Sequence, residues 1–596
     1  MTCMKNSPKS NTRAKRSTFR RLLALTKPYI HYVALAILCV LLVNGAQLLK
    51  PYILKFVIDD FLVGGVEQTI WYSIASMAVA YFLIVAIGGI FSIIQAHLMN
   101  KLSQSIMKDV RGRVFQMIQY LPLKELDQMS SGRLITRATN DVEALSDLYT
   151  NVLMSLFKDV FLVLGIVAAM LLMDVELALV SFSVVPIMFA LVLSLKKKIK
   201  KNFSVMKHYI GQINGFMAEN ISGMKLVQIY RAEQEKFEEF LELNQHYFKT
   251  TIYQVQLNSI LRPASDVFQT AAVALLLANS LGKIENMTLE IGVLYAFTTY
   301  IKQFFVPISD LAENYTTIQS ALVSADRIFE LLDQKENIEE LEKGTPIDQL
   351  MGEIEFKHVW FAYQGEDWVL KDVSFKLKAG ETGAFVGETG AGKTTIISLI
   401  SGFYAVNRGE ILIDGININD YKLSDLRRRV VVVLQDVFLF SGSVRDNITL
   451  NDEISDAIVE EALVTSCADT FIKKLPYQLE EWVMERGSTF SAGQKQLLSF
   501  ARALAHEPSI LVLDEATANI DTQTEKLIQQ AIVNASQERT TLIIAHRLST
   551  IRHADRIIVL KQGRVVEMGN HHQLIHGAGY YAHLIQSAKE NIEVLA

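Results

Sequence analysis

The chain has 596 residues, half of them apolar, and a mean hydropathy of +0.23. It is longer than a typical single domain and more apolar than an ordinary soluble enzyme, so we expect a membrane part. Lysine and arginine number 58 against 63 aspartates and glutamates, and this net charge of −5 argues against a nucleic-acid partner. The three cysteines are scattered, so we expect neither a disulfide framework nor a zinc site.

The first 28 residues are predicted to form a cytoplasmic tail. Up to Lys27 the tail contains lysines and arginines but no acidic residue. The apolar run that follows is too long for a cleavable signal peptide and lacks a small-residue cleavage site. Basic segments beside the first span are retained in the cytoplasm, which sets the expected position of this end of the chain.

Residues 29–325 are predicted to form a six-helix transmembrane domain, because six apolar stretches approach the ~20 residues needed to cross a bilayer core. They are Ile30–Leu49, Thr69–Leu98, a helix centred on Val160–Met173, Leu177–Leu195, Val267–Gly282 and Ile291–Ile308. The short connections are acidic or mixed, whereas the long ones carry lysine clusters such as Lys196–Lys201. The long segments, about 101–146 and 196–261, are therefore expected in the cytoplasm as helical extensions of the spans.

Lys302 is the charged residue that stands out within a predicted span. It lies about a dozen residues into the last span, which at 1.5 Å per residue is ~18 Å deep. A charge at that depth is costly unless it faces water or a partner. We expect Lys302 to face a wet substrate cavity.

Residues 326–351 are predicted to be a linker, since the composition turns charged and Gly344 and Pro346 interrupt it. From residue 352 to 596, short β-rich runs alternate with helical ones, which favours an α/β domain with a largely parallel core sheet and an antiparallel part at its start. The expected strands are Ile354–Phe356, Val373–Leu377, Thr382–Val386, Ile411–Ile413, Val430–Leu434, Ile510–Leu513, Thr541–Ile544 and Ile557–Leu560.

A phosphate-binding loop follows the third of these strands. It is the Walker A pattern G-x-x-x-x-G-K-[ST], made of Gly387, Glu388, Thr389, Gly390, Ala391, Gly392, Lys393, Thr394 and Thr395. The glycines let backbone N–H groups point at phosphate, and the helix that opens at Lys393 adds its positive dipole end. The Lys393 ammonium suits the β- and γ-phosphates of ATP, and Thr394 suits Mg²⁺.

Three further segments fit a nucleotide site. Tyr363 precedes the Walker loop and is a candidate for stacking on a base, although an aromatic residue there is more often structural. Gln435 follows the strand that ends at Leu434, where its amide can reach a metal and the attacking water. Ser491, Ala492, Gly493 and Gln494 open a strong helical pattern and make a second phosphate cradle.

Two acids end the strand Ile510–Leu513. Asp514 is suited to hold Mg²⁺, and Glu515 is suited to orient and deprotonate the water that attacks ATP. An acidic pair can be a simple helix cap, but its place in this series favours catalysis. Asp521 follows, and His546, after another strand, is expected to contact the γ-phosphate.

Together these features resemble half-transporters of the ATP-binding cassette (ABC) exporter superfamily, in its multidrug and lipid branch. The resemblance covers nearly the whole chain, including Leu126 and Asp127 in the first cytoplasmic segment. It implies that Tyr363 is the A-loop aromatic residue, Gln435 the Q-loop glutamine, Ser491–Gln494 the signature, Asp521 the D-loop acid and His546 the switch histidine. It also implies a dimer in which each ATP lies between one chain's Walker A loop and the other chain's signature.

The signature departs from the family pattern Leu-Ser-Gly-Gly-Gln, because Phe490 and Ala492 replace its leucine and its first glycine. The Ala492 methyl is expected to slow the site that this signature serves. Some bacterial exporters of the family pair a chain that keeps the catalytic glutamate and has an altered signature with a chain that has lost the glutamate. This chain resembles the first kind, so we expect a heterodimer with Glu515 at the competent site; a homodimer stays open.

The resulting expectation is an ATPase that exports amphipathic small molecules across the bacterial cytoplasmic membrane, with both termini in the cytoplasm and ATP and Mg²⁺ as cofactors. Its partners are a second half-transporter chain, the bilayer and the cargo. Within transport, the alternative is a lipid flippase that acts as a homodimer. From another class, the alternative is an ATP-gated channel or a regulatory subunit without cargo.

Overall fold

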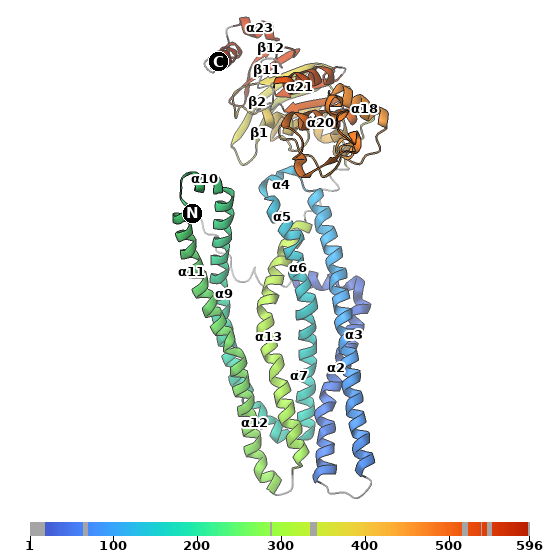
Figure 1. Cartoon of the computed structure of the whole chain (residues 1–596), viewed down its shortest axis with the longest axis vertical. Coiled ribbons are helices and arrows are strands. Elements are labelled where there is room, and N and C mark those ends of the chain that lie inside the picture. Colours follow the sequence, from blue (N-terminus) through green and yellow to red (C-terminus); the bar gives the residue numbers. More distant parts are fainter. Residues whose placement is uncertain are drawn as a thin grey trace. The chain divides into compact units, whose positions relative to one another are not determined.

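A computed structural model describes residues 18–63, 70–285, 289–333, 343–514, 522–537, 539–544, 551–577 and 579–593. The chain divides into two compact units (Figure 1). The membrane domain comprises residues 1–119 and 131–334, and the nucleotide domain comprises residues 120–130 and 335–596. The short segment 120–130, which contains helix α4 (Leu123–Gln128), thus belongs to the nucleotide domain although the membrane domain's helices flank it in the chain.

The membrane domain is helical throughout its described residues, and six helical stretches are long and apolar enough to cross a membrane, as predicted. Its main helices are α2 (Ile30–Phe56), α3 (Ile70–Gln119), α5 (Ser131–Ala138), α6 (Asn140–Asp147), α7 (Leu153–Met173), α8 (Val175–Phe182), α9 (Val185–Ser222), α10 (Met224–Ile229), α11 (Glu233–Ser259), α12 (Leu261–Glu285) and α13 (Ile291–Leu332). Helix α13 continues into the range that we predicted to be linker.

Several helices extend far beyond a bilayer's thickness. Helix α3 has 50 residues and α9 has 38, against the ~20 that a span requires. Helices α9 and α11 run side by side and are joined through the short α10 (Figure 1). Asn202 links them, since its Nδ2 donates to the Thr250 carbonyl and to Gln254 Oε1, both at 2.9 Å. These helices are therefore longer than a span requires, and the cytoplasmic position of the extra length stays a prediction.

Close packing in the membrane domain depends on small and polar residues at helix contacts. Gly165 of α7 lies so near α2 that a Cβ there would stand 2.4 Å from Leu48 Cδ1. Near the first turn of α13, the Gly292 N–H donates to Asp59 Oδ1 at 2.6 Å, and Lys55 pairs with Glu290 at 2.9 Å. These contacts bind α2 and the residues after it to α13.

The nucleotide domain contains a mainly parallel sheet and an antiparallel sheet, as the strand pattern predicts. The six-stranded sheet has the order β12-β11-β3-β10-β9-β6, and only β12 runs antiparallel. Its strands are β3 (Thr382–Val386), β6 (Val430–Val433), β9 (Ile510–Asp514), β10 (Thr540–Ile544), β11 (Arg556–Lys561) and β12 (Arg564–Gly569). The four-stranded antiparallel sheet contains β1 (Ile354–Ala362), β2 (Trp368–Leu377), β4 (Arg408–Ile413) and β5 (Ile416–Asn417), and the pair β7 (Gly442–Ser443) and β8 (Trp482–Val483) is separate.

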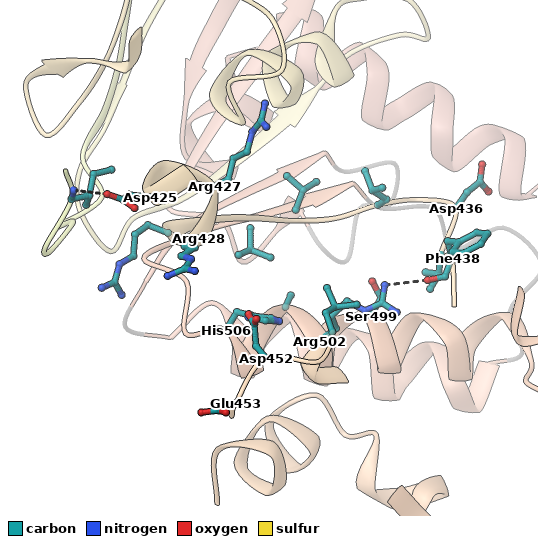
Figure 2. Close-up of a pocket in the computed structure, with 18 residues that line it drawn as sticks. Asp425, Arg427, Arg428, Asp436, Phe438, Asp452, Glu453, Ser499, Arg502 and His506 are labelled. Carbon is teal, nitrogen blue, oxygen red and sulfur yellow. Dashed lines mark hydrogen bonds and ion pairs between the residues drawn. The ribbon is translucent and has the colours of Figure 1, made fainter. Parts of the chain in front are cut away.

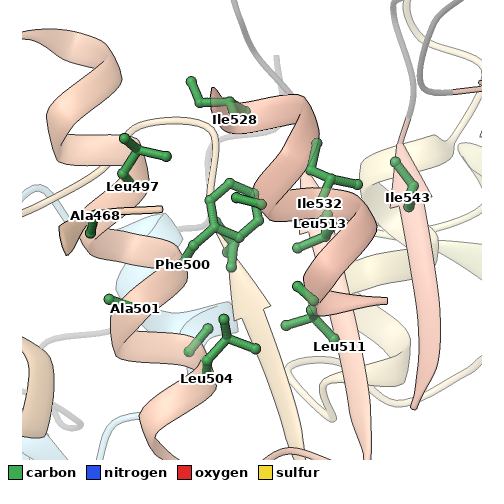
Figure 3. Close-up of a cluster of buried hydrophobic side chains, with 14 of the residues drawn as sticks. Ala468, Leu497, Phe500, Ala501, Leu504, Leu511, Leu513, Ile528, Ile532 and Ile543 are labelled. Atoms are coloured by element: carbon green, nitrogen blue, oxygen red, sulfur yellow. The ribbon is translucent and has the colours of Figure 1, made fainter. Parts of the chain in front are cut away.

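Both faces of the parallel sheet are buried, which explains its uninterrupted apolar strands. In β9, Leu511 and Leu513 face one hydrophobic cluster, and Ile510 and Val512 face another. The first cluster includes α20 (Ala492–Ala505) and α21 (Thr522–Ala535), with Phe500 at its centre (Figure 3). The second includes α15 (Lys393–Ile400) and the antiparallel sheet.

The remaining described α-helices of this domain are α16 (Leu423–Arg429), α17 (Val444–Thr449), α18 (Asp456–Thr465), α19 (Asp469–Ile472), α23 (His571–His576) and α24 (Tyr580–Glu593). Strand β12 does not follow from the apolar pattern of the sequence. It is an edge strand whose residues alternate between exposed and half-buried, so it lacks the apolar run of its neighbours.

Candidate functional site

The Walker A loop joins β3 to α15, and glycine is required at two of its positions. Gly392 has a φ of +100°, and a Cβ on it would lie 2.6 Å from Leu370 Cδ2. A Cβ on Gly387 would lie 2.4 Å from the Leu560 carbonyl oxygen. Any other residue at either position strains the loop, so these glycines shape the cradle in which phosphate is expected.

Lys393 is the first residue of α15 and is only 6 % exposed. Its Nζ donates to the carbonyls of Gly387, at 2.6 Å, and Glu388, at 3.0 Å. Burial lowers the pKa of the Lys393 ammonium, and the charge of Asp514 acts in the opposite direction. The ammonium is therefore held over the loop, where it can exchange two carbonyls for phosphate oxygens.

The remaining loop residues differ in exposure. Thr394 is exposed on the first turn of α15. Thr395 is buried, and its hydroxyl lies 3.2 Å from the hydroxyl of Tyr363. Ala391 is also buried, whereas Thr389 is exposed. Glu388 accepts a hydrogen bond from the Tyr580 hydroxyl of α24 at 2.8 Å, a partner that the spacing of the motif could not predict.

Tyr363 keeps 41 % of its surface exposed, which leaves its ring open for stacking. Phe361 and Tyr404 hold this ring by edge-to-face contacts, with centroids 4.9 and 5.1 Å away. The hydroxyl of Tyr404 in turn donates to the carboxylate of Asp127 on α4. Burial and this contact raise the pKa of Tyr404. Tyr363, the residue expected to stack on the base, thus contacts Tyr404, and Tyr404 contacts Asp127 on helix α4.

The other predicted residues follow neighbouring parallel strands. Strand β9 ends at Asp514, which pairs with Ile544 at the end of β10, and Ile544 pairs with Phe385 near the Walker loop. Val433, at the end of β6, pairs with Leu513, and Gln435 follows two residues later as an exposed side chain. Carboxyl ends of parallel strands meet at one edge of a sheet, so Asp514, Gln435 and the Walker loop share that edge. Glu515, Asp521 and His546 lie outside the described residues.

The oxygen donors at this edge suit Mg²⁺, which prefers hydroxyl, amide and carboxylate oxygens with several waters. Thr394, Gln435 and Asp514 are the candidates that the structure describes. Within the described ranges, no group of three or more His, Cys, Asp or Glu side chains could hold a metal by itself.

The signature begins helix α20. Ser491 is its N-cap: the Ser491 hydroxyl accepts from the Gln494 N–H at 3.2 Å, and Gln494 Oε1 accepts from the Ser491 N–H at 2.9 Å. Ser491 and Ala492 are exposed, whereas Gly493 is buried. Ala492 is the first helical residue and is not among the residues with positive φ, so its methyl strains no backbone. The Ala492 methyl can therefore affect only a ligand that binds at the N-terminus of α20.

A charged cavity of about 770 Å³ lies beside the segment that carries Gln435 (Figure 2). Asp436 and Phe438 line it together with Arg502 and His506 of the α20 end. Arg502 has a structural role, since its guanidinium donates hydrogen bonds to the carbonyls of Asn447 at 2.7 Å and Phe438 at 3.1 Å. Burial lowers the pKa of His506, against the charge of Asp452. No motif in the sequence indicates this cavity, because its lining comes from separate segments.

Lys302 is exposed on α13. Its proposed role in a substrate cavity stays a prediction.

Comparisons with known proteins agree with this geometry. Residues 33–308 match the family model for the ABC transporter transmembrane region, and residues 370–518 match the model for the ABC transporter. The chain is 40 % identical over 500 residues to the "Probable multidrug resistance ABC transporter ATP-binding/permease protein YheH" of Bacillus subtilis, covering 83 % of this chain and 74 % of that protein.

Two further matches extend over most of the chain. It is 32 % identical to the "ATP-dependent lipid A-core flippase" of Syntrophus aciditrophicus, with 95 % of this chain and 94 % of that protein covered. A solved bacterial Atm1-family ABC exporter with ATP bound has a TM-score of 0.79 and 26 % identity, with 94 % and 98 % covered. The chain therefore belongs to the ABC transporter family and is an exporter-type half-transporter, a transmembrane domain fused to an ATPase that drives transport.

Proposed function

We propose that this chain exports amphipathic small molecules as the catalytic half of a heterodimeric exporter in a bacterial cytoplasmic membrane, with both termini in the cytoplasm. ABC exporters work as dimers of half-transporters. The observation that carries the heterodimer is Ala492, an exposed methyl at the helix end where the family pattern has glycine. Because the methyl costs this chain no strain, its consequence is at the nucleotide of the other chain.

Each residue of the nucleotide site has a proposed task. Lys393 and the N–H groups of its loop hold the β- and γ-phosphates, and the Tyr363 ring stacks on the base. Thr394, Asp514 and Gln435 would hold the Mg²⁺ that neutralises phosphate charge. Glu515 takes the proton of the attacking water, and His546 contacts the γ-phosphate. The Asp521 segment and the signature complete the site of the partner chain.

The cargo assignment rests on the apolar membrane domain and on the named relatives. Broad, mostly apolar walls suit unselective binding of amphipathic compounds. A multidrug resistance protein is among the relatives, and so is a lipid flippase, which supports lipid transport as the second candidate. ATP-dependent uptake of an amphipathic dye into inverted vesicles tests the first candidate. ATPase activity that responds only to lipid, with no dye uptake, would favour the second.

The heterodimer is tested by hydrolysis and by native mass. We expect this chain purified alone to be nearly inactive, and the native particle to contain a second, similar chain. Glu515→Gln should lower the activity of that particle by about 10²- to 10⁴-fold, because a positioned general base contributes that much. Brisk hydrolysis by a particle with two copies of this chain would overturn the heterodimer.

Ala492→Gly gives a matched second test. In a homodimer it restores the family glycine at both competent sites and should raise the rate. In the proposed heterodimer it acts at the site whose glutamate the partner has lost, so the rate should barely change. Faster hydrolysis by the Ala492→Gly particle therefore contradicts the proposal.

A further inference from the structure

The Walker A loop carries an acidic side chain of its own. Glu388 is the second residue of the loop, and its main-chain carbonyl accepts hydrogen bonds from Lys393 Nζ at 3.0 Å and from the Ala391 N–H at 3.1 Å. A carboxylate at this position is unfavourable for ATP binding, because the loop has to receive negatively charged phosphates and like charges repel. The contacts of the Glu388 side chain therefore matter for function.

The Glu388 carboxylate is bound to helix α24 and not to the Lys393 ammonium. Its Oε1 accepts a hydrogen bond from the Tyr580 hydroxyl at 2.8 Å, whereas Lys393 binds the carbonyl of Glu388. Burial lowers the pKa of the Lys393 ammonium, and the carboxylate that opposes this shift is Asp514, not Glu388. Burial and the contact with Glu388 raise the pKa of Tyr580 to about 12, so this hydroxyl stays protonated and can donate at neutral pH.

Tyr580 is itself fixed by contacts that do not involve Glu388. The backbone N–H groups of Tyr580 and Tyr581 both donate to the carboxylate of Glu567 on β12, the second at 3.1 Å. Lys561, the last residue of β11, places its Nζ 4.3 Å from the centre of the Tyr580 ring. The first turn of α24 is thus attached to two strands, which gives the Tyr580 hydroxyl a defined position.

Strand pairing brings this part of α24 beside the Walker loop. Strands β3 and β11 are parallel neighbours, with Val386 opposite Val559. The chains stay close beyond this pair, since a Cβ on Gly387 would lie 2.4 Å from the Leu560 carbonyl oxygen. The Tyr580 ring contacts Lys561 at its face and the loop's carboxylate through its hydroxyl. The lysine's positive charge therefore lies on the side of the loop where the carboxylate is held, and it lowers the cost of a negative charge there.

We propose that Tyr580 is a positioning residue for ATP binding: its hydroxyl holds the Glu388 carboxylate against α24 and so keeps a negative charge away from the bound phosphates. The residue acts through Glu388 and needs no contact of its own with the nucleotide. The inference goes beyond the proposed export function, because it concerns ATP binding by this chain and depends on neither the cargo nor the partner.

The test is a double-mutant cycle on the ATPase of the complete exporter in proteoliposomes. For Tyr580→Phe we expect the KM for ATP to rise about 3- to 10-fold, because the released carboxylate can approach the phosphates. The kcat should stay within about twofold, since the charge acts alike on bound ATP and on its transition state. In the Glu388→Gln background, Tyr580→Phe should not raise the KM, because no charge is left to repel the phosphates.

Tyr477→Phe is the matched control, because it removes the hydroxyl of a tyrosine that is 73 % exposed elsewhere in the nucleotide domain, and its KM should equal that of the unmutated exporter. An unchanged KM in Tyr580→Phe would overturn the proposal. An equal rise with and without Glu388→Gln would also overturn it, since a purely structural loss at α24 does not depend on the charge of Glu388. A fall in kcat at constant KM would contradict it as well, because the effect would then lie in the chemical step.

Discussion

The two domains treat a buried charge in opposite ways. In the nucleotide domain, Lys393 is 6 % exposed and its ammonium donates to two carbonyls of its own loop. In the membrane domain, Asp159 is 5 % exposed, yet one carboxylate oxygen has no donor among the described residues. The Lys393 ammonium is hydrogen-bonded by residues that are close to it in the chain. The Asp159 carboxylate is placed by helices far apart in the chain and has no such local compensation.

The largest effect should come from the locally held charge. Lys393→Met keeps the side chain's length and apolar stem but removes the ammonium from the phosphate site. We expect ATPase activity to fall by about 10²- to 10³-fold, as when a preorganised electrostatic group is deleted. Lys473→Met, which removes an exposed lysine that pairs with Asp469 of α19, is the control and should retain most activity. Similar losses in both variants would show that Lys393 has no special role.

Two matched core substitutions compare the domains' stability. Phe500 is 2 % exposed at the centre of the cluster in Figure 3, and Phe297 is fully buried in the membrane domain. Phe500→Ala should cost about 3–5 kcal/mol, because it loses both transfer free energy and packing. Denaturant unfolding followed by tryptophan fluorescence measures this, since Trp360, Trp368 and Trp482 lie in the nucleotide domain.

Phe297→Ala should cost roughly half as much or less. A phenylalanine released from the helix bundle enters lipid, so the variant loses packing but little transfer free energy. Unfolding of the membrane domain in mixed detergent micelles measures the change. Equal costs for the two substitutions would contradict this difference between the domains.

The smallest effect is expected at helix α4, in the segment 120–130. Tyr404→Phe removes the hydroxyl that donates to Asp127 and keeps the aromatic contact with Tyr363. We expect a loss of about 0.5–1.5 kcal/mol in the stability of the nucleotide domain, and weaker stimulation of its ATPase by cargo. A melting temperature and a cargo response unchanged from the unmutated exporter would show that this contact does not hold α4.

Local patterns predicted much of both domains. The six spans follow from apolar length, and the parallel strands follow from short apolar runs such as Ile510–Leu513. The edge strand β12 was missed, since half of its residues are exposed and its pairing with β11 comes from the tertiary structure. The contact of Tyr404 with Asp127 was also missed, because the two residues are 277 positions apart.

The sequence by itself determined the family, the order of the elements and the nucleotide-binding motifs, because each motif is contiguous and its chemistry depends on neighbouring residues. Tertiary structure decided which polar residues of the membrane domain meet. Asn44, Asp159 and Asp310 lie on three different helices, and no periodicity or spacing places them together. Helix packing brings them together, since the rotation and depth of each helix are set by contacts such as that of Gly165 with Leu48.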